Sequence, residues 1–232
     1  MDSGEQNLIK SYYLLQKVAD NIKLPLIQIL HQAQLGKINN QTDLDQIEDI
    51  ANFSLKMIDN YVLGLNINDN EFNLEPLSLS SVLYDSAREL DKLANHYGVK
   101  LQVSINNNFG PVLSNRMALE GFLMSVGLSL IESASSTNNK VVTLATHKCR
   151  YGVVAGVYAK EINLSSSILR QGTKLIEEAK RSMPEFSHTN GAGIFVAEKL
   201  LNNINMKLMV SKHRNLKGIG TLMTTSKQLQ LI

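Results

Sequence analysis

The sequence predicts an α+β protein, with an antiparallel helical hairpin over residues 1–66 and an α/β sandwich over residues 67–232. Two observations lead to this prediction. Apolar residues recur every three or four positions before residue 66, which is the pattern of helices that pack side by side. Beyond a polar linker at 66–73, helical patterns and alternating strand patterns follow one another.

The first predicted helix covers residues 6–35 and contains a proline. Pro25 removes one backbone donor and is expected to kink the helix, at a cost of roughly 3 kcal/mol that packing must offset. The apolar positions on either side of it are spaced alternately by four and three residues: Leu8, Tyr12, Leu15, Ala19, Ile22, Leu26, Ile29 and Ala33.

A second helix is predicted to run from Thr42, which can cap its N-terminus, to Leu65. The short connection between the two helices makes them an antiparallel hairpin. One hairpin cannot bury both of its apolar faces. We therefore expect it to pair with a second copy in a dimeric four-helix bundle. The alternative is that the hairpin packs on the rest of its own chain.

The elements of the second domain are predicted in the order helix, strand, helix, two strands, helix, two strands. Ser80 or Ser81 is expected to cap the first of these helices. The predicted ranges are helix 81–97, strand 99–105, helix 116–133, strands 140–147 and 152–159, helix 191–202, and strands 206–211 and 220–225. This order predicts helices on one face of a mixed sheet.

Composition argues against several function classes. A net charge of +2 on 232 residues, without an aromatic stripe, argues against nucleic-acid binding. A single cysteine leaves no disulfide framework, and the histidines show no metal-ligand spacing. The N-terminus is unlike a signal peptide, and no apolar run approaches the roughly 18 residues that span a bilayer. We therefore expect a cytoplasmic protein, or a segment of a larger one, without metal, cofactor or membrane insertion.

Residues 20–26, Asp-Asn-Ile-Lys-Leu-Pro-Leu, resemble the H-box of sensor histidine kinases, which reads His-Glu-apolar-Arg-Thr-Pro-Leu. Asp20 occupies the place of the phosphoaccepting histidine, and Asn21 that of its acidic neighbour. Leu24 replaces the residue that helps the family to dephosphorylate a response regulator. The elements after the hairpin resemble the ATP-binding domain of the same family, so the resemblance implies a sandwich of the histidine-kinase ATPase (Bergerat) type.

In that family, three motifs build the nucleotide pocket. The two asparagines that hold magnesium and phosphates are replaced by Ser125 and Ser129, whose short side chains equally serve helix packing. The adenine loop keeps a carboxylate at Glu161 but has lost both glycines, which leaves a residual adenine contact open. Gly191 and Gly193 match the glycine pair that cradles phosphates, and such a pair serves loop-to-helix packing equally well. The closing Ser…Gly-x-Gly-Thr of the fold, largely architectural, is matched by Ser211 and residues 218–221.

Two residues outside these motifs could carry chemistry. His31 lies 11 residues past the family's acceptor position and is expected to be a solvated or capping residue. The alternative is that His31 accepts phosphate. Cys149 lies between Lys148 and Arg150 in a predicted turn, where either its thiol pKa is lowered or it is an incidental thiol.

The resemblance implies a catalytically inactive, pseudokinase-like protein, because the acceptor, the magnesium ligands and the adenine-loop glycines are missing together. The frame of the H-box survives, and the expected binding surface for a response-regulator receiver domain or a sensor kinase comprises Asp20, Lys23, Leu24, Pro25 and Ile27. One alternative is a divergent kinase or phosphotransferase that still carries phosphate or binds ATP. Another is a ligand sensor whose altered pocket binds something other than ATP.

Overall fold

The computed structural model describes residues 44–65, 73–105, 110–161 and 191–225, together with some residues between 26 and 36. Its elements in chain order are α2 (Leu44–Leu65), β1 (Glu75–Leu77), α3 (Leu79–His96), β2 (Lys100–Ile105), β3 (Val112–Ser114), α4 (Arg116–Ser135), β4 (Val141–Cys149), β5 (Gly152–Ala159), α6 (Gly191–Asn203), β6 (Leu208–His213) and β7 (Leu216–Met223).

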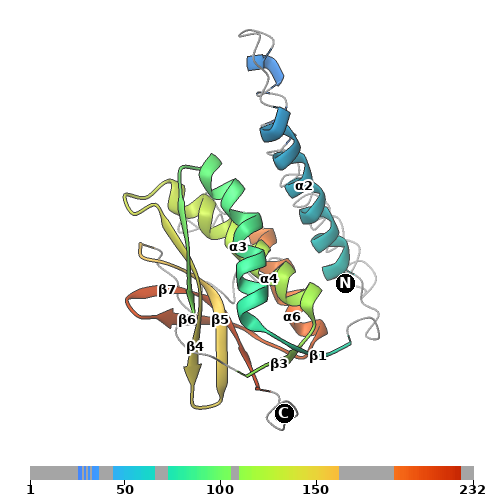
Figure 1. Cartoon of the computed structure of the whole chain (residues 1–232), viewed down its shortest axis with the longest axis vertical. Helices are drawn as coiled ribbons and strands as arrows, with labels where there is room; N and C mark the ends of the chain where they lie inside the picture. Colours follow the sequence, from blue (N-terminus) through green and yellow to red (C-terminus); the bar gives the residue numbers. More distant parts are fainter. Residues whose placement is uncertain are drawn as a thin grey trace, which may run out of the picture.

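A five-stranded mixed sheet forms one layer of the body, and helices α3, α4 and α6 form the other (Figure 1). The strand order is β2-β4-β5-β7-β6. β2 runs parallel to β4, and the other neighbours are antiparallel. This architecture confirms the predicted α/β layers with helices on one face. Strands β1 and β3 pair separately and were not predicted, because three residues are too few to show an alternating pattern.

Helix α4 is the centre of the core. It contacts α2, α3 and α6 as well as strands β4 and β5, so it is buried on nearly every side. Asn115 caps its N-terminus, with Oδ1 accepting a hydrogen bond from the Ala118 N–H at 3.0 Å. Among the described residues, α4 is the one helix long and apolar enough to cross a membrane, but most of it is buried inside the fold, as expected of a core helix.

The N-terminal cap of α3 differs from the predicted one. Ser78 caps this helix, and its Oγ accepts a hydrogen bond from the Ser81 N–H at 3.5 Å, whereas Ser80 or Ser81 was predicted to be the cap. Three serines, Ser78, Ser80 and Ser81, occur close together here, and each can act as a cap. The short strand β1 decides between them, because it ends at Leu77 and leaves Ser78 as the last extended residue before the helix.

Helix α2 packs on its own chain through one stripe. Ile50, Phe53 and Met57 are buried, and the helix contacts α3, α4 and α6. Its N-terminal end projects from the body, and Leu44 there is 68% exposed (Figure 1). The buried residues of α2 therefore pack on the same chain, which was the predicted alternative to pairing with a second copy. Pairing of the hairpin with a second copy stays a prediction, and most of the predicted first helix lies outside the described residues.

Several strand ends differ from their predicted positions. β4 continues through Lys148 and Cys149, which places Cys149 in a strand and not in the predicted turn. β6 ends at His213 and β7 already begins at Leu216, so the two strands are joined by two residues. Arg214 adopts the left-handed conformation there, with φ at 53°. Glycine or asparagine is usual at such positions, so this turn carried little sequence signal.

One carboxyl group of the core is buried with incomplete hydrogen bonding. The Tyr97 hydroxyl donates to Glu132 Oε1 at 3.4 Å, and Glu132 Oε2 has no partner among the described residues. Burial raises the pKa of Glu132 to about 7, although the hydrogen bond from Tyr97 acts in the opposite direction. The folded protein therefore holds a proton on Glu132 over a pH range in which the unfolded chain releases it.

Because the folded state disfavours the ionised Glu132 carboxylate, the free energy of unfolding falls as the pH rises from about 4.5. The full loss, about 3 kcal/mol, is present above about pH 7. Glu132→Gln should therefore raise the melting temperature at pH 8 and change it little at pH 4.5. Thermal unfolding followed by circular dichroism at both pH values measures this. The exposed Glu75→Gln is the control, and an equal effect of Glu132→Gln at both pH values would contradict the assignment.

Candidate functional site

The two serines in the predicted magnesium positions lie one turn apart on α4 and are both buried. The Ser129 Oγ donates a hydrogen bond to the Ser125 carbonyl oxygen at 3.1 Å. A serine hydroxyl that donates to the carbonyl four residues earlier is satisfied within its own helix. Ser129 therefore directs its donor into the helix and not toward a ligand.

Gly193 of α6 packs directly against these serines. A Cβ atom added to Gly193 would lie 2.6 Å from Ser129 Oγ and 2.8 Å from the Ser125 carbonyl oxygen. Only glycine allows such an approach without displacing a neighbour. Gly191 begins the same helix two residues earlier. The first turn of α6 and the middle of α4 are thus in contact, and we name the contact of Ser125, Ser129 and Gly193 the α4–α6 seam.

Glu161, the predicted adenine-loop carboxylate, takes no part in the α4–α6 seam. Glu161 follows the end of β5 by two residues, and its side chain is exposed. The structure therefore brings together Ser125, Ser129 and Gly193 and leaves Glu161 in solvent. Gly193 has a packing role in the structure. The sequence had left this role open beside the binding of phosphates.

The helix-facing side of the sheet contains two buried hydroxyls that were not singled out as chemical groups in the sequence. Thr146 of β4 and Thr221 of β7 both lie opposite Ala155 of β5. Both side chains are fully buried, and neither Oγ1 atom has a hydrogen-bond partner among the described residues. Thr221 closes the Gly-x-Gly-Thr motif. Gly218 of this motif lies opposite Tyr158 of β5, and its missing side chain leaves room for the Tyr158 ring.

Two histidines that the sequence treated as unrelated lie together on the other face of the sheet. The ring centroids of His147 and His213 are 5.7 Å apart, and each ring also lies beside Tyr158. The His213 Nε2 is 3.1 Å from Ser104 Oγ. Burial lowers the pKa of both imidazoles, and the charges of His147 and Arg214 lower that of His213 further.

This cluster corrects the view that the histidines are dispersed. In the parts of the chain that the structure describes, no three metal-ligating side chains converge. The neutral imidazoles and the tyrosine ring pack as aromatic groups over a glycine-rich part of the sheet. Their strands are distant in sequence, so only the strand order brings them together.

Most of the predicted partner surface lies outside the described residues, namely Asp20, Lys23, Leu24 and Pro25, and so does Asn21 of the H-box. Ile27 is described, is helical and is 49% exposed. His31 is likewise helical and exposed, which agrees with a solvated residue. Cys149 is partly buried at the end of β4.

Comparison with known proteins identifies the fold. No family model matches the chain, and no curated protein matches it. The histidine kinase AdeS of Acinetobacter baumannii is 11% identical, with a TM-score of 0.50 over 89% of this chain and 98% of that one. Full-length ShkA, solved with AMPPNP, is 11% identical, with a TM-score of 0.55 over 95% of this chain and 46% of that one. The described α/β body of the chain has the fold of a histidine-kinase ATPase domain.

The α4–α6 seam predicts a specific cost for enlarging its glycine. Gly193→Ala forces a methyl group against Ser129 and the Ser125 carbonyl, and overpacking of this kind costs about 1–3 kcal/mol. The melting temperature should fall by several degrees, at about 2–4 °C per kcal/mol for a chain of this size. Adding Ser129→Ala should recover part of the loss, because the backbone contact persists.

Gly110→Ala is the matched control, since a Cβ atom there has no neighbour within 4 Å. Differential scanning calorimetry of the three variants and the wild type provides the comparison. A Gly193→Ala protein as stable as Gly110→Ala would show that the two helices do not pack as described.

Proposed function

We propose that this protein is a catalytically inactive protein of the histidine-kinase fold that acts as a dimeric, cytoplasmic interaction module. In this role it binds or inhibits a response-regulator receiver domain or a sensor kinase in two-component-type signalling. The observation that carries the proposal is the α4–α6 seam. Protein atoms fill the space between the helix that would hold magnesium and the turn that would cradle phosphates.

The chemistry of the seam supports inactivity. Magnesium takes oxygen ligands in a nearly octahedral arrangement at about 2.0–2.1 Å and is bound together with substrate phosphates. Ser129 uses its hydrogen for the Ser125 carbonyl, and Gly193 lies against both residues. A nucleotide could enter here only if α6 moved away from α4, and that movement would expose buried apolar residues such as Ile194 and Leu200.

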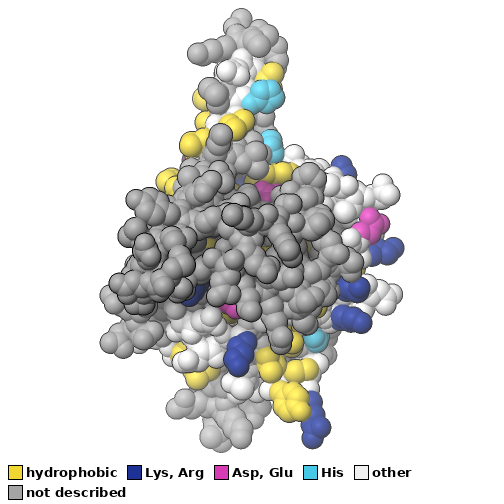
Figure 2. Space-filling view, turned by 180° about the vertical axis from the view of Figure 1, so that it is seen from behind, with side chains coloured by type: hydrophobic (Ala, Val, Ile, Leu, Met, Phe, Trp, Pro, Cys, Tyr) yellow, Lys and Arg dark blue, Asp and Glu magenta, His cyan; other side chains and the backbone are white. Residues whose placement is uncertain are grey.

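The projecting end of the molecule supports the interaction role. Figure 2 shows hydrophobic side chains gathered on this narrow end. The exposed large hydrophobic residues described in these two helical stretches are Leu26, Ile27, Leu35, Leu44 and Leu55. Exposed apolar side chains gathered in one region are typical of protein-binding sites. Leu26 is the last residue of the H-box match, and Ile27 directly follows it in the sequence.

A direct test mixes the purified chain with phosphorylated receiver domains and sensor-kinase cores from the same organism. We expect a stable complex with at least one of them, and no transfer of label to this chain. Ile27→Asp should weaken that complex at least tenfold, whereas the exposed Tyr151→Glu on the β4–β5 turn should not. The absence of any complex with the whole set would refute the proposal.

The same experiment tests the enzymatic alternative, which the exposed position of His31 on a helix keeps open. A phosphotransferase would acquire acid-labile label from a phosphorylated receiver. Label that disappears in His31→Ala would establish that alternative and contradict an inactive module.

Dimerisation through residues 6–65 is the structural half of the proposal. Light scattering should give twice the 25.7-kDa chain mass for the wild type. Ile22→Glu combined with Leu26→Glu places charges in the predicted bundle, where each buried unpaired charge costs several kcal/mol, and should yield a monomer or an unfolded hairpin. Tyr151→Glu should stay dimeric. A wild-type chain that is monomeric at all concentrations would show that the bundle does not form.

A further inference from the structure

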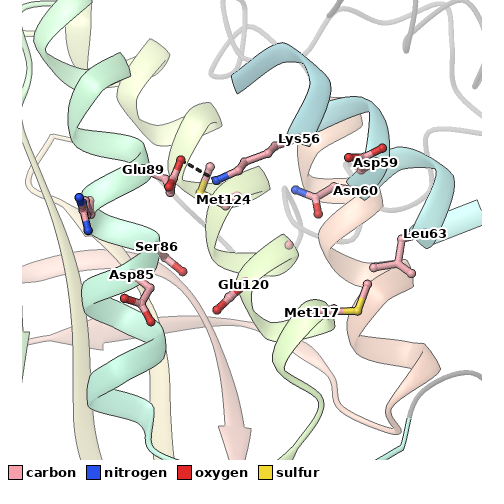
Figure 3. A pocket seen from close by; sticks show the side chains of 12 residues that line it. Lys56, Asp59, Asn60, Leu63, Asp85, Ser86, Glu89, Met117, Glu120 and Met124 are labelled. Carbon is pink, nitrogen blue, oxygen red and sulfur yellow. Dashed lines mark ion pairs between the residues drawn. The ribbon is translucent and has the colours of Figure 1, made fainter. Parts of the chain in front are cut away.

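A cavity of about 490 Å³ opens between helices α2, α3 and α4 (Figure 3). This volume lies within the usual range for small-molecule sites, about 300–1,000 Å³. Its lining residues include none of those that form the α4–α6 seam, and they do not include Glu161. The cavity is therefore a separate feature from the predicted nucleotide pocket.

Carboxylates outnumber cations around the cavity. Lys56 of α2 pairs with Glu89 of α3 at 2.6 Å. Arg116, at the start of α4, lies 2.5 Å from Asp85 and 2.8 Å from Glu120. The lining also contains Asp59 and Arg88. With Arg116 counted among them, four carboxylates (Asp59, Asp85, Glu89, Glu120) face three cations (Lys56, Arg88, Arg116), which leaves one negative charge in excess.

A buried hydroxyl points into the cavity without a partner. Ser86 is only 2% exposed, and its Oγ has no hydrogen-bond partner among the described residues. Figure 3 shows the Ser86 side chain directed from α3 toward the cavity. The Glu120 side chain points from α4 into the same space between the two helices. A buried polar atom left unpaired costs about 1–3 kcal/mol, so a ligand that supplies a donor here gains a hydrogen bond without displacing an existing one.

The remaining wall is apolar. Leu63 of α2 and Met117 and Met124 of α4 face the same space, and methionine side chains adapt readily to ligands of different shape. Burial raises the pKa of the Glu120 carboxyl even though Arg116 beside it acts in the opposite direction, and the nearby Asp85 raises it further. The ionised form of Glu120 is therefore only partly compensated by the protein's own cations.

We propose that this cavity binds a small organic cation, with a primary ammonium or guanidinium group on a short aliphatic stem. The cationic head donates to Ser86 Oγ and Glu120 and neutralises the excess charge. The stem packs on Met117 and Met124. The remaining wall of the site comes from the projecting helix α2, through residues such as Lys56 and Leu63. This site goes beyond the proposed interaction role and does not depend on it.

Calorimetric titration of the full chain with n-butylguanidine and n-pentylamine tests the proposal. Ligands of this size reach a Kd of about 1 mM or tighter when a charged head and an apolar stem are both accommodated. Neutral n-pentanol and anionic hexanoate should bind at least tenfold more weakly. Absence of saturable binding of both cations at 10 mM, on the order of ten times that Kd, would overturn the proposal. Equal binding of pentanol would also overturn it, because it would show an apolar cavity without charge selection.

Variants locate the site. Ser86→Ala and Glu120→Gln should each weaken binding of the cations at least tenfold. Asp91→Asn, which removes an exposed carboxylate from the same helix outside the cavity, should leave binding unchanged. Ser86→Ala removes a buried unpaired hydroxyl, so this variant should fold and melt at or above the wild-type temperature. Cation binding that survives both cavity variants would place the site elsewhere and refute the assignment.

Discussion

The close packing of α6 on α4 is the constraint on which the rest of this structure depends. Helix α4 is buried on nearly every side, and the first turn of α6 closes one of these sides through Gly193. A fold of this kind usually becomes an enzyme by keeping a space between such elements for a ligand. Here Gly193 lies directly against Ser129 and the Ser125 carbonyl, so the two helices are in close contact at this point.

Most of the fold followed from the sequence because it depends on periodicity. The helices α3, α4 and α6 and the five strands of the sheet show clear patterns, and their predicted positions are close to those observed. The short pair β1–β3 and the turn at Arg214 were missed, because neither carries a periodic or glycine signal. The choice of Ser78 as a cap depended on where β1 ends, which local propensity does not decide.

The site was predictable only in part, since its residues are determined by contacts between distant segments. Ser125, Ser129 and Gly193 were identified by motif spacing, and the structure brings them together, but their direct contact depends on helix packing. The pairing of His147 with His213 and the cavity beside Ser86 had no sequence signature. Both arise from the order of strands and helices in space, which composition and spacing do not encode.

An inactive module should bind no nucleotide, and calorimetry with ATP and magnesium measures this. With the α4–α6 seam filled and Glu161 exposed, titration to 1 mM nucleotide should give no saturable heat, and thermal unfolding should show no shift. Saturable binding would contradict the claim. Its loss in Glu161→Ala would then show that the adenine loop still works and that the protein senses nucleotide.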